Sequence, residues 1–114
     1  MGRIIHVDNS GFFRKAMRIF LAELGLESEA FELGEDAINA IMSGKVSCLI
    51  TGLELSDMSG EELLNRIDLP SRSMTVIAVT GSDNEERIEK LRAMGVKATI
   101  NKGKDWKEKL REYF

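Results

Sequence analysis

Short apolar runs alternate along this chain with longer segments in which apolar residues recur every three or four positions. Three runs are rich in β-branched residues, which is typical of strands buried on both faces of a parallel sheet. They are Ile4–Val7, Cys48–Ile50 and Val76–Val79. Two weaker runs, Glu29–Leu33 and Lys97–Ile100, indicate flanking strands. The pattern therefore predicts a sheet built from these five segments.

The segments between the runs have the periodicity of amphipathic helices. The clearest begins near Phe13, keeps its apolar residues on one face as far as Leu24, and meets a stop signal at Gly25. The other four predicted helices carry these apolar positions: Ala37, Ile38, Ile41 and Met42; Leu63, Leu64 and Ile67; Ile88 and Leu91, closed by Gly95; and Trp106, Leu110 and Phe114.

Two capping boxes predict where the third and fourth helices begin. Ser59 is followed by Glu62, and Ser82 by Glu85, at the three-residue spacing of this motif. Each predicted strand is thus followed by a predicted helix after a short connection. Such units form right-handed crossovers, so the sequence predicts an α/β fold with an open, doubly wound sheet.

The composition narrows the class of protein. The 114 residues predict one domain, residues 1–114, and a net charge of -3 spread along the chain gives no sign of a nucleic-acid site. No apolar stretch is long enough for a membrane span or a signal peptide, so we expect a soluble, cytoplasmic protein. Nucleotide motifs of the glycine-rich or Walker type are also missing.

Two reactive residue types occur once each, and both lie in predicted strands. We interpret Cys48 as a small buried hydrophobe rather than a nucleophile. We interpret His6 as a hydrogen-bonded core or rim residue, because no second histidine is present to form a metal pair. The sequence therefore predicts neither redox nor zinc chemistry.

Polar residues follow four of the predicted strands at their carboxyl ends. They are Asp8 and Asn9, Gly52, Thr80 and Lys102. In open α/β sheets the ligand crevice lies beyond these ends, near the point where the strand order reverses. We therefore expect the four segments to converge on one small polar pocket.

These segments resemble the receiver domain of bacterial response regulators, and the resemblance runs from Arg3 to the last predicted helix. The matching motifs are Val7-Asp8-Asn9-Ser10, Gly34-Glu35-Asp36-Ala37, Met58-Ser59-Gly60, Val79-Thr80-Gly81 and Asn101-Lys102-Gly103. The resemblance implies a flavodoxin-like (βα)5 fold, with a five-stranded parallel sheet of order 2-1-3-4-5 and helices on both faces. It also implies a role in two-component signal transduction and phosphorelay.

In receivers, two acids after the first strand and an aspartate after the third bind Mg²⁺, and that aspartate accepts a phosphoryl group. By this resemblance Asp8 matches the first acid, Thr80 the phosphate-contacting hydroxyl and Lys102 the ammonium. Asn9 stands in place of the second acid, and Gly52 in place of the acceptor. An acyl phosphate needs a carboxylate, and glycine has none.

Further departures from the family pattern surround the pocket. Ser56 and Gly103 replace prolines, and Thr99 stands where many receivers carry an aromatic switch residue. Apart from what Glu54 offers, only Asp8 keeps a negative charge in the pocket. Because Mg²⁺ depends on carboxylate ligands, we expect weak or absent Mg²⁺ binding and no other cofactor.

Three interpretations of the pocket follow. In the first, Asp8, Lys102 and Thr80 form a standing polar cluster. In the second, Glu54, Asp57 or Ser59 accepts phosphate in place of residue 52. In the third, the vacated space holds a small anion or ligand.

We interpret the chain as a stand-alone pseudo-receiver that is not an enzyme. It is expected to act as an adaptor for a protein partner of a signalling pathway, such as a kinase or another regulator, and to be a monomer or weak homodimer. Receivers commonly dock partners through the last two helices and the strand between them. The expected partner-binding face is therefore Thr99, Trp106, Tyr113 and Phe114.

Overall fold

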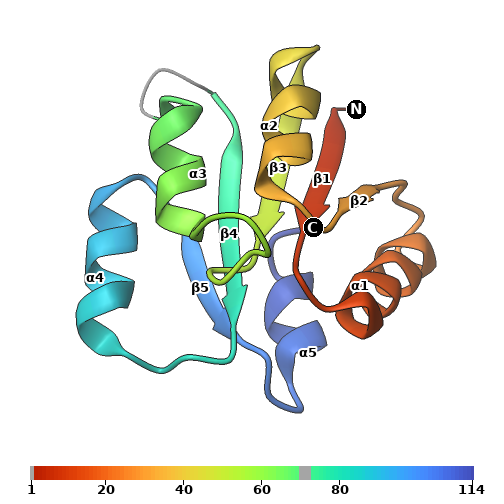
Figure 1. Cartoon of the computed structure of the whole chain (residues 1–114). Coiled ribbons are helices and arrows are strands. Elements are labelled where there is room, and N and C mark those ends of the chain that lie inside the picture. Colours follow the sequence, from red (N-terminus) through yellow and green to blue (C-terminus); the bar gives the residue numbers. More distant parts are fainter. Residues whose placement is uncertain (1, 70–72) are drawn as a thin grey trace.

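The computed structural model describes residues 2–69 and 73–114, and within them five strands alternate with five helices (Figure 1). The strands are β1 (Arg3–Val7), β2 (Glu29–Phe31), β3 (Val46–Thr51), β4 (Thr75–Thr80) and β5 (Ala98–Asn101). The helices are α1 (Gly11–Glu23), α2 (Gly34–Met42), α3 (Gly60–Arg66), α4 (Glu85–Ala93) and α5 (Trp106–Arg111). All ten elements predicted from the apolar pattern are confirmed.

The strands form one parallel sheet with the order β2-β1-β3-β4-β5, as predicted. The register pairs Val7 of β1 with Thr51 of β3, and Thr80 of β4 with Asn101 of β5. The carboxyl ends of these strands therefore lie at the same edge of the sheet. This flavodoxin-like arrangement brings the loops that follow β1, β3, β4 and β5 together.

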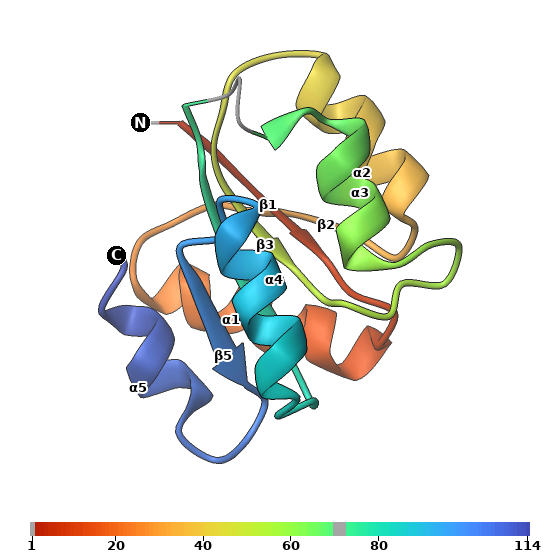
Figure 2. The same ribbon diagram turned by 90° about the vertical axis from the view of Figure 1, so that its left-hand side faces the viewer.

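Helices cover both faces of the sheet (Figure 2). One core lies between the sheet and α1 with α5, and a second lies between the sheet and α2, α3 and Leu91 of α4. Alternate strand residues serve opposite cores: Ile4 packs toward α1, whereas Ile5 packs in the core with α2 and α3. Burial on both faces explains why the strands are continuous apolar runs in the sequence.

One of the two predicted helix starts is confirmed. Ser59 caps α3, since its hydroxyl accepts a hydrogen bond from the Glu62 N–H at 3.1 Å. The box predicted at Ser82 is wrong, because Asn84 caps α4 and accepts from the Arg87 N–H at 2.9 Å. Ser82 instead accepts from the Asn84 N–H at 3.2 Å, which closes a turn before the helix.

The predicted helix stops are confirmed, whereas several element edges are corrected. Gly25 and Gly95 adopt φ of 80° and 108°, the left-handed conformation that glycine permits after a helix. Leu33 is the N-cap of α2 rather than part of β2, and Met42 at the end of α2 is 51% exposed rather than in the core. Phe114 lies beyond the end of α5. Among the described residues, no helix is long and apolar enough to cross a membrane.

Candidate functional site

A hollow of about 190 Å³ opens at the carboxyl ends of β1, β3 and β4. The structure brings together around it all six residues that the sequence placed in the pocket: Asp8, Asn9, Gly52, Glu54, Thr80 and Lys102. Leu53, Val79 and Gly81 complete the lining. The parallel register produces this convergence, because each loop leaves the sheet at the same edge.

An ion pair between Asp8 and Lys102 forms the floor of the pocket. The Lys102 Nζ lies 2.8 Å from the Asp8 Oδ2, and the Asp8 side chain is only 2% exposed. The other carboxylate oxygen of Asp8 accepts a hydrogen bond from the Ser10 N–H at 2.9 Å. The Lys102 ammonium also lies 4.5 Å from the centre of the Phe13 ring, a cation–π contact. The ammonium thus faces both the carboxylate and an aromatic ring.

Thr80 is bonded to Lys102 through its backbone. Its carbonyl accepts from the Lys102 N–H at 2.9 Å, which fixes the loop after β5 against the end of β4. Its hydroxyl accepts from the Ser82 N–H at 3.1 Å. The expected cluster of Asp8, Lys102 and Thr80 therefore contains the Asp8–Lys102 pair, with the Thr80 hydroxyl turned to its own loop.

Gly52 follows β3 directly and lies against Asp8. Its N–H donates to the Val7 carbonyl at 2.8 Å, so the backbone is held in place. A Cβ at position 52 would lie 3.1 Å from the Asp8 Oδ2, which is a tight contact. A Cβ on Gly60 would lie 2.7 Å from the Gly52 carbonyl, so glycine at position 60 allows α3 to approach this loop. The space beside Asp8 is therefore narrow.

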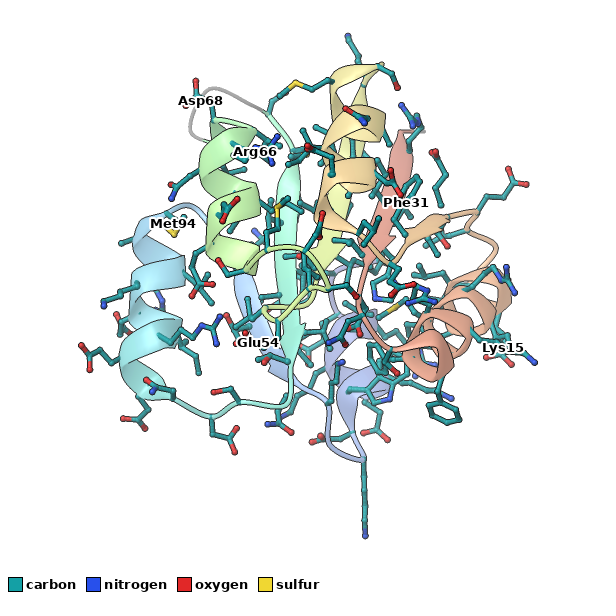
Figure 3. The ribbon with its side chains drawn as sticks, in the orientation of Figure 1. Lys15, Phe31, Glu54, Arg66, Asp68 and Met94 are labelled. Carbon is teal, nitrogen blue, oxygen red and sulfur yellow. The ribbon has the colours of Figure 1, made fainter. Side chains whose placement is uncertain are left out.

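Glu54 lies on the pocket rim, but its carboxylate is paired with Arg87 of α4. The Arg87 guanidinium also forms two hydrogen bonds with Glu61 of α3, at 2.6 and 2.9 Å. These bonds raise the pKa of Arg87, and the Arg87 hydrogen bond lowers the pKa of Glu61. Figure 3 shows Glu54 on the loop between β3 and α3, facing α4. We name Glu54, Glu61 and Arg87 the α4 clamp.

The sequence reasoning missed the α4 clamp. Glu54 and Arg87 are 33 residues apart, and no motif links them. The only signal available was that their predicted elements adjoin in the sheet order.

Asp57 and Ser59, which the sequence offered as other phosphate acceptors, both cap helices. The Asp57 carboxylate accepts from the backbone N–H groups of Gly34 and Glu35 at 2.7 and 3.0 Å. Although desolvation raises the pKa of Asp57, these N–H donors leave it below its ordinary value. Ser59 caps α3 through its hydroxyl. Both side chains therefore have structural partners in the described part of the chain.

His6 is buried as expected, but the expected hydrogen bond is absent. Neither ring nitrogen has a partner among the described residues, and the ring packs against the Phe13 ring with centroids 5.9 Å apart. Burial lowers the pKa of His6 to about 4, so the ring is neutral at pH 7. Cys48 is buried as predicted, and burial raises its pKa to about 12.

The expected partner-binding face needs one correction. Trp106 is only 9% exposed, because it packs between Phe13 and Phe20 of α1 with ring centroids 4.9 and 5.4 Å away. Tyr113 and Phe114 are 38% and 43% exposed, and Thr99 is half-buried in β5. Trp106 therefore belongs to the core, whereas the two terminal aromatics are accessible.

The family model for the response regulator receiver domain matches residues 4–113. The chain therefore belongs to the response regulator receiver domain family. Members of this family are signal-transduction modules of two-component systems that act through protein partners.

Solved receiver domains have the same fold. A signal receiver domain from Vibrio parahaemolyticus is 24% identical, with a TM-score of 0.89 over 98% of this chain and 85% of its own. A CheY-like response regulator receiver domain protein from Methanospirillum hungatei is 24% identical, with a TM-score of 0.88 over 99% of this chain and 90% of its own. The signal receiver domain of an HD domain-containing protein from Pseudomonas fluorescens is 25% identical, with a TM-score of 0.85 over 98% and 83%.

Proposed function

We propose that this receiver domain transmits its signal by binding a protein partner, without phosphorylation at position 52. The single observation that carries the proposal is Gly52, at the end of β3 beside Asp8, where the family resemblance expects the acceptor aspartate. Without a carboxylate at this position no acyl phosphate can form there. The domain then acts as an adaptor rather than as a phosphorylation switch.

The contacts of the nearby oxygen nucleophiles support the proposal. Glu54 is held by Arg87, Asp57 by the first N–H groups of α2, and Ser59 by the first turn of α3. A phosphoryl transfer to any of them requires breaking these contacts and moving the side chain into line with the donor. Phosphorylation of a substitute residue is therefore disfavoured.

Weak Mg²⁺ affinity belongs to the same proposal. Mg²⁺ prefers near-octahedral oxygen ligands, including one or two carboxylates. In the pocket, Asp8 is paired with Lys102 and Glu54 with Arg87, and Asn9 is neutral. Within residues 2–69 and 73–114, no group of three or more His, Cys, Asp or Glu side chains is arranged to hold a metal. The residues present do not fit the family's ion.

An anion sensor in the pocket is a weaker candidate. The hollow has room for a small ligand, and Lys102 provides one ammonium. Two carboxylates, Asp8 and Glu54, line the same hollow and repel an anion. A thermal shift on adding sulfate or phosphate tests this candidate, and we expect none beyond the effect of ionic strength.

The expected docking face in the adaptor role includes Thr99, Tyr113 and Phe114. The two exposed aromatics are of the kind enriched at binding hot spots. Trp106 is not part of this face, because it packs in the core against α1.

Intact mass after incubation with acetyl phosphate and Mg²⁺ tests the proposal. We expect no gain of a phosphoryl group in the natural sequence. A Gly52→Asp variant restores the carboxylate, and an active receiver under the same conditions verifies the reagent. A stable, Mg²⁺-dependent gain in the natural sequence would contradict the proposal, and peptide mapping would then identify the acceptor.

A further inference from the structure

β2 is an edge strand, and one of its sides has no neighbouring strand. The strand order places it at one end of the sheet, beside β1 alone (Figure 1). The Phe31 carbonyl accepts from the Asp8 N–H at 3.0 Å, so the backbone groups of Phe31 face β1. Because successive residues of a strand direct their backbone groups to opposite sides, those of Ala30 face away from β1. Ala30 is exposed, so its N–H and its carbonyl are open to an added strand.

The residues on either side of β2 extend this open edge. Ser28 and Glu32 have the same alternation as Ala30. Among the described residues, no hydrogen bond of the turns and loops engages the backbone of Ser28 or Glu32. The Glu32 carboxylate accepts from the neutral Ser56 hydroxyl at 3.0 Å, so it keeps its charge. We name residues 28–32 the β2 edge.

The chain around the β2 edge is acidic. Residues 19–44 include six acidic side chains and no lysine or arginine. Glu29 pairs with Arg3, and Glu35 pairs with Arg66. The other four acids form no ion pair with any described residue, and all four are exposed: Glu23, Glu27, Glu32 and Asp36. A strand added to β2 would therefore meet a negative potential.

This potential selects among the possible occupants of the edge. β2 of a second copy would bring glutamates opposite glutamates, and like charges on adjacent strands repel. The other edge strand of a second copy, β5, has no lysine or arginine within Ala98–Asn101. A bilayer or a nucleic acid is itself anionic and is repelled. The complementary occupant is an extended segment of another protein that carries basic side chains.

We propose that the β2 edge binds an extended, basic segment of a protein partner, which adds a sixth strand to the sheet. The backbone of this segment would bond to Ala30, and its lysines or arginines would lie near Glu27 and Glu32. This inference rests on the proposed protein-binding function and adds the surface and the chemistry of the partner. The β2 edge lies at the opposite end of the sheet from β5 and Thr99.

A short peptide of alternating lysine and valine, with both ends blocked, tests the β2 edge. Titration into the ¹⁵N-labelled protein should shift the amide signals of Ser28, Ala30 and Glu32, and fluorescence anisotropy gives the affinity. Only alternate N–H groups of an added strand face β2, so N-methylation of the lysine amides and N-methylation of the valine amides should have unequal effects. One methylated peptide should bind about tenfold more weakly than the other. A peptide with glutamate in place of lysine should not bind.

Two pairs of variants separate backbone pairing from charge. Ala30→Pro removes the outward N–H and should weaken binding about fivefold or more, whereas Ala30→Val keeps the N–H and should bind within about twofold of the natural sequence. Glu27→Gln/Glu32→Gln should also weaken binding about fivefold, because it removes two charges beside the segment. Its control is Glu62→Gln/Glu85→Gln, which removes two exposed charges on α3 and α4 and should stay within about twofold. Far-UV circular dichroism verifies the fold of each variant, and the methylated peptides decide if Ala30→Pro does not fold.

Several outcomes would overturn the β2 edge as a docking site. They are unshifted amide signals of β2, equal affinity for the two methylated peptides, equal loss in the control variant, or a self-association of the natural chain that Ala30→Pro abolishes. Absent peptide binding would leave the glutamates only the protection of the edge against aggregation. Acetyl phosphate labelling of the same samples separates the two proposals. A mass gain with intact peptide binding contradicts only the proposed phosphorylation independence, and no gain with no binding contradicts only the docking edge.

Discussion

Two ion pairs stand on opposite sides of the same pocket, and they differ in exposure. In the Asp8–Lys102 pair the side chains are 2% and 28% exposed. In the Glu54–Arg87 pair they are 71% and 25% exposed. A buried carboxylate depends on its partner because water cannot replace it, whereas an exposed carboxylate is solvated when its partner leaves. The Asp8–Lys102 pair therefore stabilises the interior of the pocket. The Glu54–Arg87 pair connects α4 to the rim of the pocket.

The elements around the two pairs differ in the same way. On the Lys102 side, Phe13 packs against both His6 and Trp106 in a buried apolar core. On the Arg87 side, α4 buries only Leu91, and Arg87 pairs with Glu54 and Glu61 of the neighbouring elements. Disturbing the buried side should affect global stability, and disturbing the exposed side should affect α4 locally.

The largest expected effect comes from His6 on the buried side. Its pKa is about 4 in the folded chain against 6.5 for the ordinary group, so folding favours the neutral ring. Burial lowers this pKa most; Asp8 opposes the shift, and Lys102 and Arg14 add to it. The neutral His6 therefore contributes its full share to the free energy of unfolding above pH 6.5. This share is lost as the pH falls toward 4, and the total loss is about 3 kcal/mol.

Urea unfolding between pH 7 and pH 4 measures this loss. A His6→Leu variant should lose much less stability over the same window, because leucine binds no proton. Carboxylate titrations occur in both proteins and cancel in the difference. If the free energy of unfolding falls equally with pH in both proteins, burial does not keep His6 neutral.

The next effect is expected from the Asp8–Lys102 pair. Lys102→Met should lower the free energy of unfolding by about 2 kcal/mol at pH 7, since it leaves a buried carboxylate without its cation. The loss is less than for a fully buried pair because the Lys102 side chain is partly exposed. Chemical denaturation measures it, and unchanged stability would show that the pair is dispensable.

Adding Asp8→Asn to Lys102→Met should recover part of the stability, because no charge then remains unpaired. Lys97→Met serves as the control, since Lys97 is exposed on another loop. A double variant less stable than Lys102→Met alone would contradict the pairing.

The sheet and the pocket follow from local sequence signals, whereas the ion-pair and aromatic contacts do not. β-branched runs predict buried parallel strands, and the carboxyl ends of parallel strands meet at one edge, so Asp8, Gly52 and Lys102 could be placed together. The partner of Glu54 could not be predicted, because two charged residues 33 positions apart pair only through tertiary geometry. The burial of Trp106 was missed for the same reason, since Phe13 and Phe20 of α1 cover it.

A smaller effect is expected on the exposed side. Arg87→Met should lower the free energy of unfolding by only about 1 kcal/mol, because solvent weakens the ion pairs that Arg87 makes with its partners. Hydrogen exchange should reveal more than global unfolding does: the amides of α4 should exchange faster while those of β1 and β3 stay protected. Lys90→Met is the matched control, since the Lys90–Glu86 pair is exposed and 4.0 Å long. Equal exchange in both variants would show that α4 is held by apolar packing alone.

The smallest effect, and the one that bears most directly on the pocket, is the charge of a side chain at position 52. Gly52→Asn and Gly52→Asp introduce side chains of nearly the same size, and both place a Cβ 3.1 Å from the Asp8 Oδ2. The difference in stability between the two variants therefore isolates the effect of the second negative charge.

We expect Gly52→Asp to be less stable than Gly52→Asn by about 0.5 kcal/mol at pH 7 and low salt, because the carboxylates of residues 8 and 52 repel each other and Lys102 offsets only part of this repulsion. Thermal unfolding of both variants with and without added salt measures the difference, which should shrink as salt screens the repulsion. If Gly52→Asp is instead the more stable variant, Lys102 holds two carboxylates at once, and the buried side of the pocket retains the capacity to accept an acidic residue at position 52.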